Sequence, residues 1–279
     1  MAIRVAGANW DVAVLRALAD DPPPELSDEQ RQLHVLRLLL DAIGEDIKVF
    51  LGCHGAKYAS RWKHACDPYA AMVSWMADYF LHLYEFTQAG AQAIPAWPAA
   101  VRGAAALGDT TRLVLGMQLG YCLLGPMLAE EATGRPAYPL VHDHNAAVLR
   151  MYRERLRLGR PMILTDLGAS DIRQWIKSDG IIFANIDTTY PGTRRTSALP
   201  FLGGQLTVPT GLLGLALRRS LDVRAMAAPG SHGQVTVKVS EPLAGGDLTK
   251  CLREFGSYSE RWVTAHPEQW MAWGSLAEC

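Results

Sequence analysis

Apolar residues at helical spacing dominate the first third of the chain. Residues 26–43 place Ser27 before the first turn and Gln30 three positions later, the pattern of a capping box at a helix start. Apolar positions three and four residues apart follow, and the same spacing returns at residues 67–86, so both segments are predicted to be amphipathic helices. Residues 89–109, rich in alanine and proline, are predicted to be a connection.

Short apolar runs bounded by turn residues follow this connection, and the segments between them carry helical spacing. The first run is predicted to break at Gly116 and to continue into a helix. Helices are also predicted at residues 170–180, capped by Ser170, and from Pro209 to residue 220. The predicted strands lie at residues 111–116, 136–141, 161–166, 180–187, 221–228 and 233–240.

The alternation of strands and helices predicts the fold class. It indicates an α/β fold with a mixed, mostly parallel central sheet flanked by helices. The helices before the sheet form an N-terminal helical extension. Residues 1–108 are therefore predicted to be a helical region packed on a core formed by residues 109–279.

Composition and charge narrow the classes of partner. The net charge of −1 excludes a broad basic surface for nucleic acid or an anionic membrane. The first residues lack a cationic segment followed by an apolar core, and prolines and glycines interrupt the uncharged stretch 196–217, so we expect no transmembrane anchor and a cytoplasmic location. The five cysteines are odd in number and widely spaced, which favours reduced thiols, and neither they nor the Cys/His-rich residues 53–67 match a standard zinc spacing.

The order of motifs in the second half resembles a known family. A lysine–glycine turn leads into an apolar strand that ends at Asp187, and LPFLGG, then Pro209-Thr210-Gly211 and finally HPEQW at 266–270 follow. This order resembles the bacterial late acyltransferases of lipid A biosynthesis, members of the lysophospholipid acyltransferase superfamily. The resemblance implies an acyltransferase-like core and acyl transfer as the activity.

The family's catalytic element is a histidine followed five positions later by an acidic residue, at the turn after the first core strand. These two places fall on Met117 and Cys122, which cannot act as an imidazole–carboxylate pair. Gln118 and Tyr121 belong to the same turn, and we predict that Met117, Gln118 and Tyr121 bind substrate. The family's basic cluster after the terminal Trp is also missing, which argues against a lipid acceptor at a bilayer surface.

Three other positions offer replacement chemistry. Cys122 in the first turn of a helix is either a nucleophile that accepts an acyl group or a small buried apolar residue. His142 and His144 follow a predicted strand and either replace the lost base or belong to a solvated loop; a metal site there is the weakest alternative.

The strand end at Asp187 and the loop beside it complete the predicted site. The resemblance implies a pocket role for Asp187. Arg194 and Arg195 either grip a phosphate, phosphopantetheine or carboxylate or belong to the solvated surface.

The sequence therefore predicts a soluble acyltransferase that moves an acyl or aminoacyl group from a carrier thioester or ester to a small soluble amine or hydroxyl. It predicts no tightly bound cofactor and no metal; the acyl carrier or ester-linked acyl donor is a cosubstrate. The alternatives are a catalytically silent homologue that holds an acyl chain or a carrier protein, and hydrolysis or condensation of a carrier-bound intermediate on the same scaffold.

Overall fold

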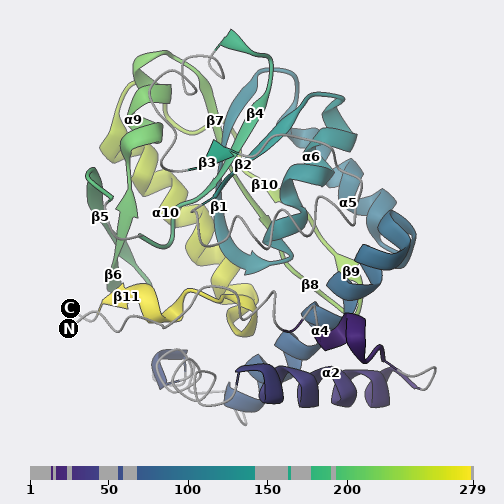
Figure 1. Ribbon diagram of the computed structural model, residues 1–279. Helices are drawn as coiled ribbons and strands as arrows, with labels where there is room; N and C mark the ends of the chain where they lie inside the picture. The colour runs from purple at the N-terminus through teal and green to yellow at the C-terminus, as the bar shows by residue number, and fades with distance from the viewer. Residues whose placement is uncertain are drawn as a thin grey trace.

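A mixed sheet of order β10-β7-β1-β4-β2-β3 forms the centre of the structure (Figure 1). In it β1 is parallel to β4 and β7, β2 is parallel to β3 and β4, and β10 is antiparallel to β7, which confirms the predicted mixed, mostly parallel α/β sheet. The strands are β1 Thr111–Gly120, β2 Ala137–Val141, β3 Ile163–Leu164, β4 Ile181–Asn185, β7 Asp222–Ala228 and β10 Lys238–Val239. This computed structural model describes residues 14, 17–23, 27–43, 56–58, 68–141, 163–164, 177–189 and 193–277.

The central strand β1 is longer than its sequence predicts. It does not break at Gly116 but continues to Gly120. Beyond Gly116 it pairs with β7 through a register shift, and Leu119 forms an antiparallel bridge with Trp270. A Cβ at Gly116 would lie 2.2 Å from Oδ1 of Asn185, so any larger residue there requires the Asn185 side chain to move. Met117 and Gln118 are therefore strand residues rather than turn residues.

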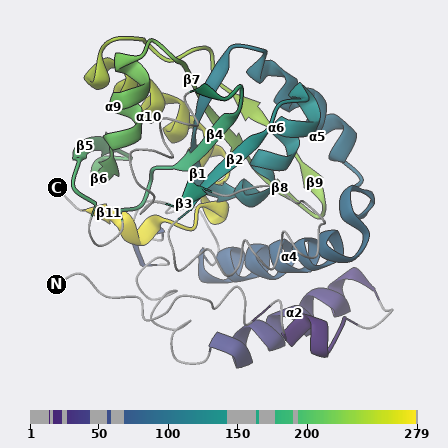
Figure 2. The same ribbon diagram turned by 45° about the horizontal axis from the view of Figure 1, so that its top comes forward.

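Helices cover both faces of this sheet. α5 Trp97–Ala104 and α6 Gly125–Thr133 lie on one face, and α9 Gly211–Arg218 and α10 Leu248–Ala265 on the other (Figure 2). The predicted connection at 89–109 is wrong in that it contains α5 between the 3₁₀ turns η1 Gly90–Ala93 and η2 Ala105–Leu107. Pro98 occupies the first turn of α5, and Trp97, Ala100 and Ala104 give that helix a buried face.

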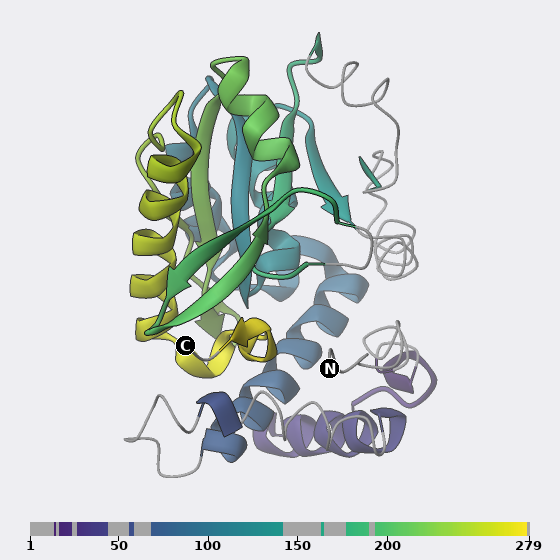
Figure 3. The same ribbon diagram turned by 90° about the vertical axis from the view of Figure 1, so that its left-hand side faces the viewer.

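The N-terminal helices close one end of the molecule. In α2 Asp28–Ile43, the Ser27 N–H donates to Oε1 of Gln30, and the Gln30 N–H donates to Oγ of Ser27, so the predicted capping box is confirmed. α4 Pro68–Ala89 lies across the carboxyl ends of β1 and β7, with α2 packed against its other side (Figures 1 and 3). The buried face of α4 joins the same hydrophobic cluster as the sheet.

Two hairpins complete the described structure. β5 Thr196–Phe201 pairs with β6 Gly204–Pro209, and β6 also pairs with β11 Leu276–Ala277. Leu202 and Gly203, both at positive φ, form the two-residue loop between β5 and β6. The strand predicted at 233–240 is divided instead. Its first part, β9 Gln234–Val235, pairs with β8 Gly230–Ser231, whereas β10 pairs with β7.

The C-terminal segment runs through η5 Pro267–Gln269 and η6 Trp273–Ser275 before β11. Most of the helix predicted at 170–180 and of residues 53–67 lies outside the described residues. No helix in the described part of the chain combines the length and the apolarity that crossing a bilayer requires.

The end of β1 gives a test of this register. Gly120 and Gly108 share a left-handed φ, +62° and +63°, but a Cβ at Gly120 would lie 2.3 Å from the Ala228 carbonyl oxygen, whereas nothing lies within 4 Å at Gly108. We expect Gly108→Ala to cost about 1–3 kcal/mol of unfolding free energy from its backbone conformation alone, with φ +63° and ψ −172°. Gly120→Ala adds an overlap with backbone atoms, worth roughly 1–3 kcal/mol more. Equal losses in denaturant titrations would contradict the close approach of β1 to β7.

Candidate functional site

Asp187 lies just beyond β4 and is fully buried. Its Oδ2 atom accepts hydrogen bonds from the Gln118 N–H and from the Trp270 indole N–H, each at 2.8 Å. Its Oδ1 atom is buried and has no hydrogen-bond partner among the described residues. The Oδ2 atom thus joins β1 to the C-terminal segment, whereas Oδ1 takes no part in this connection.

Burial controls the protonation of this group. It raises the pKa of Asp187 from 3.8 to about 6, against the opposing effect of the hydrogen bonds from Trp270 and Gln118. The side chain is therefore mostly ionised at neutral pH and gains a proton in mildly acidic solution. A buried carboxyl with a raised pKa at the carboxyl edge of a parallel sheet is a candidate for binding or catalysis.

Cys122 lies beside Asp187 but has the properties of an interior residue. It occupies the 3₁₀ turn η3 Cys122–Leu124, before α6, and not the first turn of the helix as predicted. Its half-buried thiol interacts with the Asn185 side chain, and burial together with the Asp187 charge raises its pKa to about 12. The proton stays on sulfur because the neighbouring carboxyl, with a pKa of about 6, is a far weaker base than the thiolate.

The structure separates the three residues that were predicted to bind substrate, two of which lie in β1 and one directly after it. Met117 is buried in the core. Gln118 lies at Asp187, and its side-chain amide donates to Oγ1 of Thr188 at 3.0 Å. Tyr121 is buried and points toward α4, where its hydroxyl donates to Oδ2 of Asp78 at 3.3 Å. Burial and the Asp78 carboxylate raise the pKa of Tyr121, so the phenol keeps its proton.

The remaining predicted residues are not assembled with Asp187. Arg194 and Arg195 are exposed in the segment before β5, where the Arg195 carbonyl accepts a hydrogen bond from the Thr210 N–H. Neither guanidinium contacts Asp187 or Cys122 in the described structure. His142 and His144 lie outside the described residues, so their role as a base stays a prediction.

Sequence reasoning missed a second buried carboxylate, Asp78 on α4, which is 3% exposed. Oδ1 accepts a hydrogen bond from Nε2 of Gln32 at 3.0 Å, and Oδ2 accepts one from the His232 N–H at 2.7 Å. The imidazole Nδ1 atoms of His82 and His232 lie 3.4 and 3.3 Å from Oδ1. An acid with a histidine four positions later, inside an apolar helix, was the available sequence signal.

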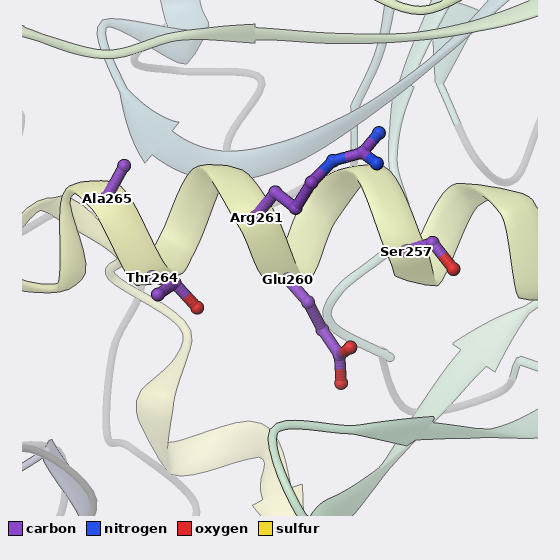
Figure 4. Close-up of a pocket in the computed structure, with 5 residues that line it drawn as sticks. All are labelled: Ser257, Glu260, Arg261, Thr264 and Ala265. Carbon is purple, nitrogen blue, oxygen red and sulfur yellow. The ribbon is translucent and has the colours of Figure 1, made fainter.

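A shallow hollow on the outer surface of α10 is less suited to chemistry. Glu260 there accepts a hydrogen bond from the Leu202 N–H at 2.6 Å, and Arg261 stacks on the Tyr258 ring. Figure 4 shows the Glu260 and Arg261 side chains pointing in opposite directions rather than converging. The hollow is lined by Ser257, Glu260, Arg261, Thr264 and Ala265.

Within the described ranges, no group of three or more His, Cys, Asp or Glu side chains is arranged to hold a metal ion. Comparison of the sequence with protein-family models finds no match, and a search of the curated proteins finds none.

The thiol of Cys122 gives a direct chemical test. A shift of the pKa from 9 to about 12 lowers the thiolate fraction at pH 8 roughly a thousandfold. We expect iodoacetamide to modify Cys122 very slowly in the folded protein and rapidly after unfolding in urea, as measured by peptide mass mapping. Equally fast modification in both states would instead support the nucleophile.

The raised pKa of Asp187 predicts that the free energy of unfolding depends on pH. Between the unfolded pKa near 3.8 and the folded value of about 6, the folded protein holds a proton that the unfolded chain has lost. The stabilising contribution of this proton is complete below pH 4 and disappears as the pH rises through 6, a loss of about 3 kcal/mol. Asp187→Asn keeps an oxygen for both donors but does not titrate. The unfolding free energy of the wild type, relative to this variant, should therefore fall between pH 4 and 7; parallel curves would contradict the raised pKa.

Proposed function

We propose that this chain is a cytoplasmic acyltransferase, which moves an acyl or aminoacyl group from a carrier thioester or ester to a small soluble amine or hydroxyl. Two features support the proposal. The first is the order of motifs resembling the lipid A acyltransferases, carried on an α/β sheet with a mostly parallel centre. The second is a buried carboxyl at the edge of that sheet where ligands of such folds bind.

Asp187 is the single observation on which the proposal depends. A fully buried carboxylate is unfavourable unless donors surround it, yet Oδ1 lacks a donor among the described residues. An amine or hydroxyl of an acceptor supplies the missing N–H or O–H. In this proposal Oδ1 binds and orients the acceptor, while Oδ2 holds the end of β1 through Gln118.

The state of Cys122 favours direct transfer over an acyl-enzyme. With a pKa of about 12, its thiol is a poor nucleophile at neutral pH. The acceptor nitrogen or oxygen therefore attacks the donor carbonyl carbon itself. The bond from that carbon to the carrier sulfur or oxygen breaks, and the acceptor's proton ends on the departing carrier group.

A catalytically silent homologue that holds an acyl chain or carrier protein is the second candidate. The observation that favours it is the pair of positions where the family keeps its dyad, since Met117 is buried in the core and Cys122 holds its proton. A silent homologue predicts binding of an acyl carrier without a product.

The experiment compares turnover in matched variants. The protein is mixed with acyl and aminoacyl thioesters of N-acetylcysteamine and with a panel of small amines and alcohols, and products are measured by mass spectrometry. We expect Asp187→Asn to lower kcat/KM roughly a hundredfold, through loss of a charged hydrogen bond to the acceptor. Cys122→Ala should stay active and form no covalent adduct.

Asp222→Asn is the control, because Asp222 is half-buried with a buried Oδ1 atom that has no partner in the described structure, but it begins β7 at the opposite edge of the sheet. Its activity should match the wild type. Absence of product with every donor–acceptor pair, together with saturable binding of an acyl carrier protein, would replace the proposal by the silent homologue. A covalent acyl adduct on Cys122 would instead support a mechanism through an acyl-enzyme intermediate.

A further inference from the structure

The outer face of α10 carries a row of exposed side chains. The helix packs its buried face, which includes Cys251, Phe255 and Val263, toward the sheet, and its other face forms part of the outside of the molecule (Figure 3). Positions spaced three or four residues apart run along the middle of this outer face, and a helix places such positions in one line. This α10 row consists of Lys250, Arg253, Ser257, Arg261 and Thr264, which are all exposed.

Every charged side chain of the α10 row is a cation, namely Lys250, Arg253 and Arg261. In the described part of the chain, none of these side chains forms an ion pair. The Arg261 guanidinium lies instead over the Tyr258 ring, 4.6 Å from its centre. The row from Lys250 to Arg261 extends roughly 16 Å along the helix, so its positive charges share one short surface.

The two acids of α10 flank the row, where backbone amides of neighbouring segments hold them. Oε2 of Glu254 accepts a hydrogen bond from the Ala244 N–H at 2.7 Å, and Oε1 of Glu260 accepts one from the Leu202 N–H at 2.6 Å. Figure 4 shows that the Glu260 and Arg261 side chains leave the helix in opposite directions. The chain as a whole has a net charge of −1, so the cationic surface on α10 is a local feature.

Aromatic side chains and a hollow adjoin the C-terminal half of the row. The centroids of the Tyr258 and Trp262 rings, both half-buried, lie 5.8 Å apart, and Arg261 stacks on Tyr258. Tyrosine, tryptophan and arginine are the residues that most often dominate the binding energy of protein interfaces. A hollow of about 530 Å³ beside Arg261, lined also by Ser257 and Thr264, offers room for a side chain of a partner (Figure 4).

The C-terminal end of α10 lies near Asp187. After Ala265 the chain passes through η5 to Trp270, whose indole N–H donates to Asp187. The chain between Ala265 and Trp270 reaches roughly 18 Å at most. A carrier protein bound along the α10 row therefore holds its acyl group within reach of the edge of the sheet where Asp187 lies.

A protein helix that carries carboxylates fits this surface better than a nucleic acid or a membrane does. Phosphate backbones and anionic bilayers bind to broad basic surfaces, whereas Glu254 and Glu260 border the cations of the α10 row. Carboxylates at helical spacing match cations that are spaced in the same way, and arginine binds a carboxylate through paired hydrogen bonds. Charge pairs of this kind steer and orient a partner.

We propose that the outer face of α10 is the docking surface for an acidic carrier protein that delivers the acyl donor; this inference rests on the proposed acyl transfer. Carboxylates of one carrier helix pair with Lys250, Arg253 and Arg261, and a carrier side chain enters the hollow beside Thr264. Docking brings the thioester to the edge of the sheet and takes no part in the making or breaking of bonds. The small thioesters of N-acetylcysteamine therefore bypass it.

The test measures binding and turnover in a charge-reversed variant. We expect Lys250→Glu, Arg253→Glu and Arg261→Glu together to weaken the binding of a purified acidic acyl carrier protein roughly 10–100-fold, as measured by isothermal titration calorimetry. The kcat/KM for the thioester of that carrier protein should fall to the same extent, whereas kcat/KM for the N-acetylcysteamine thioester stays unchanged. Added salt should weaken the binding to the wild type, because ions screen exposed charges.

The matched control is Lys177→Glu, Arg219→Glu and Lys238→Glu together. These side chains are also exposed and form no ion pair in the described structure, but they lie on other elements. The control changes the net charge by the same amount, so its carrier binding should stay close to that of the wild type. Circular dichroism and urea unfolding check that both variants fold. If the triple reversal impairs folding, the three corresponding single glutamine variants are measured instead and should each weaken binding.

The outcomes distinguish the two proposals. Equal carrier binding by the wild type and the folded reversed variant overturns the docking surface and leaves the proposed function standing. Carrier binding that the reversal abolishes, without product from any thioester, overturns the acyl transfer and keeps the docking surface in a silent homologue. Binding to vesicles of anionic lipid but not to the carrier protein assigns the α10 row to a membrane instead. Absence of binding to either probe also overturns the docking surface.

Discussion

The end of the central strand is held by a buried carboxylate. Asp187 accepts hydrogen bonds from the backbone of β1 and from the Trp270 indole, so three segments distant in sequence meet at one group. Separating them leaves a buried charge and two donors unpaired, which costs more than the bonds themselves contribute. Trp270 in turn packs edge-on against Phe201 and Trp273, so the C-terminal segment is part of the site.

A second buried carboxylate, Asp78, accepts a hydrogen bond from Tyr121, which follows β1 three positions after Gln118. Asp78 ties Tyr121 and the β8–β9 hairpin to α4, at the end of the molecule that α4 closes (Figure 3). β1 reaches both groups because it continues past the last β4 pairing at Gly116. The extended end of one strand thereby brings two buried acids to the same edge, and one of them has an oxygen without a hydrogen-bond partner in the described structure.

This arrangement separates the scaffold from its chemistry. The two positions predicted to correspond to the family's catalytic pair hold Met117 and Cys122, one in the core and the other protonated at neutral pH. Both side chains contribute to packing rather than to acid–base chemistry. Ligands of such folds bind at the carboxyl edge of the sheet, where the ends of several strands meet.

The sequence by itself determined the elements whose signals are local. The capping box at Ser27, the amphipathic pattern of α4, and the apolar runs of β1, β4 and β7 predicted the helices and the mostly parallel sheet, because periodicity and capping depend on neighbours in the chain. It also placed Asp187 at a strand end. Only the tertiary structure decided that β1 continues through Gly116, since its pairing partners beyond that residue are β7 and Trp270, which lie far away in the chain. The environment of Cys122 and the Asp78–His232 pair were likewise beyond the sequence, because burial and a contact across 154 residues depend on how distant segments pack.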